Sequence, residues 1–204
     1  MKIGVLALQG AFDAHQRALH EVGACTTQVR TPADLARVDA LVMPGGESTT
    51  MSRLLVSSGL FDELDARIGA GMPVFGTCAG MILLARDVVD GRPDQRSFGA
   101  IDLVVQRNGY GRQVDSFETD ITLDPELDDD ERSFHAVFIR APKVVDTGDG
   151  VDVLARHEGV PVLVRQANVL AAAFHPELSG DPRVHEAFLR QVGARVATAS
   201  NEKM

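Results

Sequence analysis

A cysteine between two glycines is the strongest chemical signal in the sequence. Gly76-Thr77-Cys78-Ala79-Gly80 follows a strand-like apolar run and opens an apolar, helix-like stretch, Met81–Ala85. The pattern predicts a nucleophile elbow with cysteine in place of serine: the glycines permit a tight turn, and the helix N-terminus favours a thiolate. Backbone N–H groups at such a turn can also stabilise an oxyanion. The alternative is a buried cysteine beside an ordinary strand–helix turn.

A nucleophilic cysteine needs a base, and the base usually needs an orienting group. His175-Pro176-Glu177 offers both, directly after the apolar run Val169–Phe174. This placement puts the imidazole at the carboxyl end of a strand, where α/β sheets bind their ligands. A satisfied structural histidine is the alternative, but an upstream cysteine elbow favours catalysis. Three other histidines lie in helical patterns and are expected to be surface or packing residues: His15, His20 and His185.

A glycine-rich turn, Pro44-Gly45-Gly46-Glu47-Ser48-Thr49, follows another buried strand. Paired glycines let backbone N–H groups approach a ligand closely, and Ser48 or Thr49 can cap the next helix. No Walker-type lysine follows, so a nucleotide phosphate site is poorly supported. The segment fits an oxyanion donor and substrate clamp facing Cys78, although an ordinary capped turn is the alternative.

Metal chemistry finds little support. The chain has no Cys-x-x-Cys pair and no His-Glu-x-x-His motif, so neither a structural zinc site nor a zincin is indicated. The acidic run Asp128–Glu131 lacks the spacing of a calcium loop and is expected to be a solvated face within an exposed loop, Asp124–Arg132. The residues therefore indicate no metal site.

Composition narrows the class of protein. The chain has 204 residues, 45% of them hydrophobic, with a formal net charge of −9 and two cysteines, Cys25 and Cys78. These values suit a globular domain rather than a disordered chain or a disulfide scaffold. No apolar run approaches the length of a membrane span, the start lacks a signal-peptide pattern, and no basic stripe points to nucleic acid. We expect a cytoplasmic protein that binds neither membrane nor nucleic acid.

The order of elements predicts an α/β fold: a doubly wound, mostly parallel sheet flanked by helices, with antiparallel β additions. Parallel strands are expected at Lys2–Leu8, Ala24–Val29, Ala40–Met43 and Pro73–Phe75, and helices at Phe12–Val22, Thr49–Val56, Leu60–Ile68 and Asp181–Val192. Later short strands are expected at Ile101–Val105, Ser116–Leu123, Phe134–Ile139, Val151–Ala155, Val160–Gln166 and Val169–Phe174. We expect one domain over residues 1–196 and a disordered tail over 197–204.

The three motifs together resemble the class I (triad) glutamine amidotransferase family, in which they occur in this order. The resemblance implies that Cys78 is the nucleophile, that His175 is the general base and acid, and that Glu177 orients it. It also implies an oxyanion hole formed by the backbone amides of Gly46 and Ala79.

Further segments are similar to the glutaminase subunits of pyridoxal 5′-phosphate (vitamin B6) synthases, and span nearly the whole chain. They are Val5–Phe12, Pro44–Thr49, Arg107–Gln113, Phe138–Pro142 and Phe174–Leu178. This resemblance implies that L-glutamine is bound by Gly46, Glu47, Ser48, Arg107, Ile139 and Arg140. It implies hydrolysis to L-glutamate and ammonia through a cysteine thioester, and no metal or bound cofactor in this subunit. The implied partner is a barrel-shaped, PdxS-type synthase subunit that receives the ammonia and uses ribose 5-phosphate and glyceraldehyde 3-phosphate.

Two alternatives stay open. Another triad hydrolase, such as a γ-glutamyl hydrolase or an amidotransferase serving a different synthase, would share Cys78 and His175 but would not need the Arg107–Gln113 and Phe138–Pro142 segments. A non-enzymatic docking scaffold would need no intact set of Cys78, His175 and Glu177.

Overall fold

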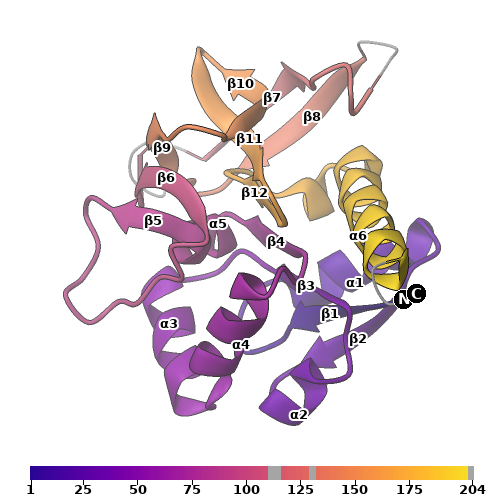
Figure 1. Cartoon of the computed structure of the whole chain (residues 1–204). Coiled ribbons are helices and arrows are strands. Elements are labelled where there is room, and N and C mark those ends of the chain that lie inside the picture. The colour runs from indigo at the N-terminus through magenta and orange to yellow at the C-terminus, as the bar shows by residue number, and fades with distance from the viewer. Residues whose placement is uncertain (110–115, 129–131, 202–204) are drawn as a thin grey trace.

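A mostly parallel sheet forms the centre of the molecule (Figure 1). The computed structural model describes residues 1–109, 116–128 and 132–201, without the side chains of 196–201. The sheet has seven strands in the order β10-β11-β12-β4-β3-β1-β2. The parallel part comprises β1 (Lys2–Leu6), β2 (Cys25–Val29), β3 (Ala40–Met43), β4 (Val74–Thr77) and β12 (Val169–Ala172), and β10 (Asp152–His157) and β11 (Val160–Gln166) continue it antiparallel.

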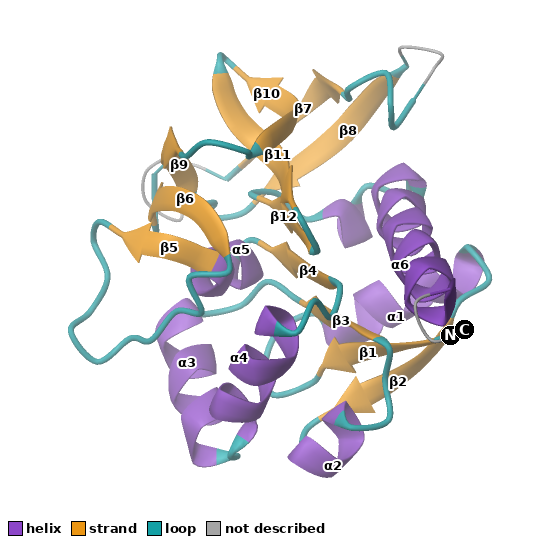
Figure 2. Ribbon diagram, in the orientation of Figure 1, coloured by secondary structure: helices purple, strands orange, loops and turns teal. Residues whose placement is uncertain are grey.

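Helices cover both faces of this sheet, as Figure 2 shows. On one face lie α1 (Phe12–Glu21) and α6 (Arg183–Asn201), and on the other α3 (Ser48–Ser57) and α4 (Leu60–Gly69). Strands β3, β4 and β12 are buried along their whole length, which explains their continuous apolar sequences. Two short helices complete the set, α2 (Pro32–Leu35) and α5 (Ala79–Leu84).

Two smaller sheets lie beside the central one. One is the three-stranded β5-β6-β9 (Ala85–Val88, Ile101–Gln106, Lys143–Thr147), and the other is the hairpin β7-β8 (Phe117–Thr122, Ser133–Phe138). Phe134 and Phe138 of β8 lie 5.6 and 5.7 Å from the ring of Phe174, and the N–H of His175 donates to the carbonyl of Val137 at 2.9 Å. The hairpin therefore fixes the segment that carries His175. These additions confirm the predicted fold class.

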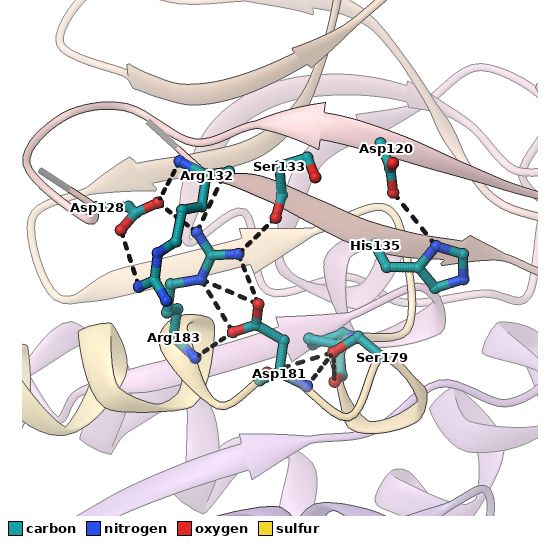
Figure 3. Close-up of polar contacts among 9 residues, drawn as sticks. Asp120, Asp128, Arg132, Ser133, His135, Ser179, Asp181 and Arg183 are labelled. Atoms are coloured by element: carbon teal, nitrogen blue, oxygen red, sulfur yellow. Dashed lines mark hydrogen bonds and ion pairs between the residues drawn. The ribbon is translucent and has the colours of Figure 1, made fainter. Parts of the chain in front are cut away.

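The structure corrects several local expectations. Helix α2 and strands β5 and β9 were not expected, and α6 continues to Asn201 rather than ending at Val192. The backbone over 197–201 is thus helical, whereas a disordered tail was predicted over 197–204, of which residues 202–204 lie outside the described residues. Asp128 is also not solvated: it is only 6% exposed, because its carboxylate lies against the guanidinium of Arg183. Figure 3 shows this cluster, in which Arg183 also contacts Asp181 and the carbonyls of Arg132 and Ser133.

Candidate active site

Cys78 lies in a sharp turn between β4 and α5. Its φ and ψ angles are 48° and −102°, in a region that residues with a side chain seldom adopt, and its N–H donates to the carbonyl of Ala172 at 2.8 Å. A Cβ on Gly76 would lie 2.7 Å from the carbonyl carbon of Gly80, so the two ends of the turn approach too closely for a side chain there. The expected elbow geometry is thus present, with Ala79 as the first residue of α5.

His175 and Glu177 follow β12, the neighbour of β4. Nδ1 of His175 lies 2.8 Å from Oε1 of Glu177, which sits in a short 3-10 helix, Pro176–Leu178. Burial alone lowers the pKa of His175, but hydrogen bonds and charge attraction from Cys78 and Glu177 outweigh it and raise the pKa to about 10. Burial raises the pKa of Glu177, but the electrostatic influence of His15 and the hydrogen bond with His175 hold it below its usual value. The pair therefore favours a protonated imidazole beside an ionised carboxylate.

A pocket of about 290 Å³ opens over Cys78 and His175. Its lining includes every residue expected to contact glutamine, although these residues come from distant parts of the chain: Gly46, Glu47, Ser48, Arg107, Ile139 and Arg140. It also includes Ile82 and four residues that belong to the quoted segments but were given no individual role: Gly10, Ala11, Gly45 and Asn108. Glu177 does not line the pocket, and its side chain is completely buried.

The glycine-rich turn forms one wall of the pocket. A Cβ on Gly45 would lie 2.4 Å from Cε1 of His175, so only glycine fits against the imidazole. The following helix α3 is capped by Glu47 rather than by Ser48 or Thr49, because its carboxylate accepts from the N–H groups of Thr49 and Thr50. Gln9 accepts from the N–H of Glu47 at 3.0 Å and so ties the turn to the segment after β1.

Charged groups line the mouth of the pocket. Nη2 of Arg107 lies 2.9 Å from Oε1 of Glu47, and Arg140 has a positive φ of 46°. The carbonyl of Ile139 lies 3.8 Å from Sγ of Cys78. Residues 110–113 of the expected Arg107–Gln113 segment lie outside the described residues.

Two histidines expected at surface or packing positions belong to the polar surroundings of the site. His15 and His185 are completely buried, and Nε2 of His15 lies 3.2 Å from Oε2 of Glu177. Sequence reasoning missed both, and also missed Thr77, whose hydroxyl lies 3.1 Å from Nε2 of His15. Within the described part of the chain, no group of three or more His, Cys, Asp or Glu side chains is arranged to hold a metal ion.

Comparison with known proteins settles the family. Residues 5–194 match the SNO glutamine amidotransferase family. The chain belongs to this family. Among curated relatives, it is 58% identical over 188 residues to the pyridoxal 5′-phosphate synthase subunit PdxT of Frankia alni, covering 92% of this chain and 93% of the relative. It is 54% identical over 192 residues to PdxT of Thermosipho africanus, and the match covers 94% of this chain and 99% of that relative.

Solved structures agree with this SNO family assignment. A crystal structure of a glutamine amidotransferase superposes with a TM-score of 0.85 at 48% identity, covering 94% of this chain and 98% of the other. PurLQS from Thermotoga maritima superposes with a TM-score of 0.66 at 15% identity, and the match covers 96% of this chain and 98% of the other. At this low identity, the superposition supports the fold alone. The resemblance inferred from the motifs is confirmed, and the chain is an enzyme of the glutamine amidotransferase class. None of the described helices combines the length and apolar composition needed to span a bilayer.

Proposed function

We propose that the chain is the glutaminase subunit of a pyridoxal 5′-phosphate synthase and hydrolyses L-glutamine through a thioester on Cys78. The observation that carries this proposal is the pocket over Cys78, which the expected glutamine-binding residues line and beneath which His175 contacts Glu177 at 2.8 Å. The high identity to synthase subunits named PdxT supports the choice of synthase.

The first chemical step is attack of the Cys78 sulfur on the side-chain amide carbon of glutamine. His175 takes the proton of the Cys78 thiol as the sulfur attacks, and the raised pKa of the imidazole stabilises that proton on His175. When the C–N bond breaks, His175 gives its proton to the nitrogen, which leaves as ammonia. Water then attacks the thioester carbon, His175 accepts a proton from that water, and the thiolate leaves as glutamate is released.

The tetrahedral intermediates carry negative charge on the former amide oxygen. Ala79 opens α5, so its N–H has no partner within the helix and is available to that oxygen. The Gly46 amide, in the wall opposite, is the second donor. Losing one such donor typically lowers kcat about 10²–10³-fold.

The charged groups at the pocket mouth suit the two ends of an amino acid. Glu47, with a pKa held below its usual value, is ionised, because hydrogen bonds from Thr50 and Thr49 outweigh the effect of burial. Its carboxylate complements the α-amino group, and the guanidinium groups of Arg107 and Arg140 complement the α-carboxylate. Ser48 and the Ile139 backbone complete the glutamine contacts.

Ammonia is the product that the partner consumes. The proposed partner is a PdxS-type synthase subunit, which takes up ammonia through a tunnel and builds the cofactor ring from ribose 5-phosphate and glyceraldehyde 3-phosphate. A protected route makes chemical sense, since free ammonia becomes protonated in bulk water. The proposed location is the cytoplasm, where both cysteines would stay reduced.

Glutamate release from L-glutamine tests the proposal, measured for this chain alone and mixed with a PdxS-type synthase. The synthase should stimulate release, and Cys78→Ala should abolish it while near-ultraviolet circular dichroism shows an intact fold. Near-normal release by Cys78→Ala would remove the thioester mechanism. Equal rates with and without synthase would favour a free-standing hydrolase. No release by the wild type, while a known PdxT activates the same synthase, would favour the docking scaffold.

A further inference from the structure

The two carboxylate oxygens of Glu177 have different surroundings. Oε1 contacts Nδ1 of His175, as the triad requires. Oε2 has no well-aligned hydrogen bond among the described residues, but Nε2 of His15 lies 3.2 Å from it. Both side chains are 0% exposed, so water does not screen this electrostatic contact.

Besides Glu177, groups from two elements, β4 and α6, contact His15. It projects from α1, and its Nε2 lies 3.1 Å from the hydroxyl of Thr77 in β4, the residue directly before the nucleophile. Its Nδ1 lies 3.1 Å from Nε2 of His185 in α6, 170 residues away along the chain. Phe75 packs edge-on against both imidazole rings, at 6.3 and 5.9 Å between centroids.

These contacts decide which ring nitrogens carry protons. Burial lowers the pKa of both His15 and His185, that of His185 to about 3, so both rings are neutral near pH 7. A bare Nε2 on His15 would place a lone pair 3.2 Å from the negative Oε2 of Glu177, so the proton belongs on Nε2. Nδ1 of His15 then accepts from Nε2–H of His185, and this leaves Nδ1 of His185 bare. That atom indeed has no hydrogen-bond partner among the described residues.

We propose that His15 is a positioning residue for the reaction: its Nε2–H, 3.2 Å from the second oxygen of Glu177, holds that carboxylate by electrostatic attraction, and His185 fixes the tautomer that makes this possible. The inference rests on the triad proposed above. The titratable groups that face His15 are Glu177, His185 and, at longer range, His175. Because Thr77 shares the Nε2 contact, the same imidazole also connects the carboxylate to the strand that carries Cys78.

Loss of this N–H should act on the chemical step and leave substrate binding unchanged. Without the contact between His15 and Oε2, the carboxylate of Glu177 can rotate away from His175 and is protonated more easily. We expect kcat to fall about 10- to 100-fold, the range seen when a hydrogen bond to a charged or orienting group is lost, with KM for glutamine unchanged. The acidic limb of the pH profile should move to higher pH.

A matched pair of variants tests the proposal in the full chain with its synthase partner. His15→Gln keeps an N–H near the position of Nε2, whereas His15→Met has similar length and no donor. We expect His15→Met to lose kcat and shift the acidic limb, and His15→Gln to recover most of both. Equal kcat and equal pH profiles for the two variants would overturn the proposal. A purely structural role would change Tm in both variants and would leave the acidic limb of the pH profile where it is in the wild type.

A double-mutant cycle separates this idea from the triad itself. In a Glu177→Gln background, His15→Met should cost no further kcat, while multiplicative losses would show that His15 does not act through Glu177. If the His15 variants do not fold, His185→Gln and His185→Met give the same comparison. Equal kcat for these two variants would refute the positioning of Glu177 through His15 and His185. Retained activity in Cys78→Ala would instead refute the triad, so the two failures are distinguishable.

Discussion

Glu177 accepts a hydrogen bond from Nδ1 of His175 at 2.8 Å, although only two positions separate these residues in the chain. Such a short spacing brings the two side chains together because Pro176 opens a 3-10 turn immediately after His175. The orienting carboxylate is therefore supplied locally, and Cys78 is the only proposed triad member that comes from a distant segment.

Replacing Glu177 by Gln should lower kcat for glutamine hydrolysis less than Cys78→Ala does. The amide can still contact Nδ1 of His175, but it loses the charge that stabilises the imidazolium. Steady-state glutamate release from both variants, with the synthase present, measures the difference. A loss in Glu177→Gln as large as that in Cys78→Ala would contradict its role as an orienter.

Gly45→Ala should inactivate the enzyme without unfolding it. The new Cβ would lie 2.4 Å from Cε1 of His175, so the imidazole must move, and a displacement of about 1 Å can cost about 10²-fold in rate. Gly69→Ala is the matched control, because a Cβ there meets nothing within 4 Å at the end of α4. Comparable kcat for the two variants would show that the close approach does not matter.

Acid should destabilise the protein partly through His185. Its folded pKa of about 3 lies below the ordinary value of 6.5, so the unfolded chain binds more protons between these values. The contribution to stability is complete above pH 6.5 and is lost as pH falls toward 3, with a slope of at most about 1.4 kcal/mol per pH unit. Urea unfolding at pH 7, 6 and 5 should therefore show a flatter dependence for His185→Gln than for wild type. Parallel slopes would contradict the buried, neutral state of this imidazole.

Arg183→Met should lower Tm by about 5 °C or more. The substitution removes the guanidinium that pairs with Asp128 and Asp181, and it leaves the nearly buried carboxylate of Asp128 without this partner. Arg53→Met removes an exposed pair with Asp94 and should change Tm by less than about 2 °C. Differential scanning calorimetry of both variants gives the comparison, and a similar small change in each would exclude a stabilising cluster.

Much of the fold could be predicted from the sequence because the central strands are buried on both faces. Continuous apolar runs such as Ala40–Met43 and Val169–Phe174 mark β3 and β12 closely, although β12 ends at Ala172. Short elements were harder to predict. Helix α2 has only four residues, too few to show a periodic pattern, and the sequence feature that marks its start is the capping box of Thr31 with Asp34. The single-domain organisation stays a prediction.

The proposed catalytic groups were visible in sequence because each lies at the end of an apolar strand. Their polar support was not visible. His15 and His185 occupy polar-looking positions of two helices, and their burial depends on how α1 and α6 pack together over β4. The burial of Asp128 likewise depends on Arg183, which lies 55 positions away along the chain.

The arrangement of α6 limits when the supported site can form during synthesis. His185 of α6 contacts His15 of α1, so α6 closes over residues that are synthesised well before it. A nascent chain halted after Glu177 would possess every proposed catalytic side chain and still lack this support. The contact between α1 and α6 can therefore form only after α6 has been synthesised, and before then Glu177 lacks the support that His185 provides through His15.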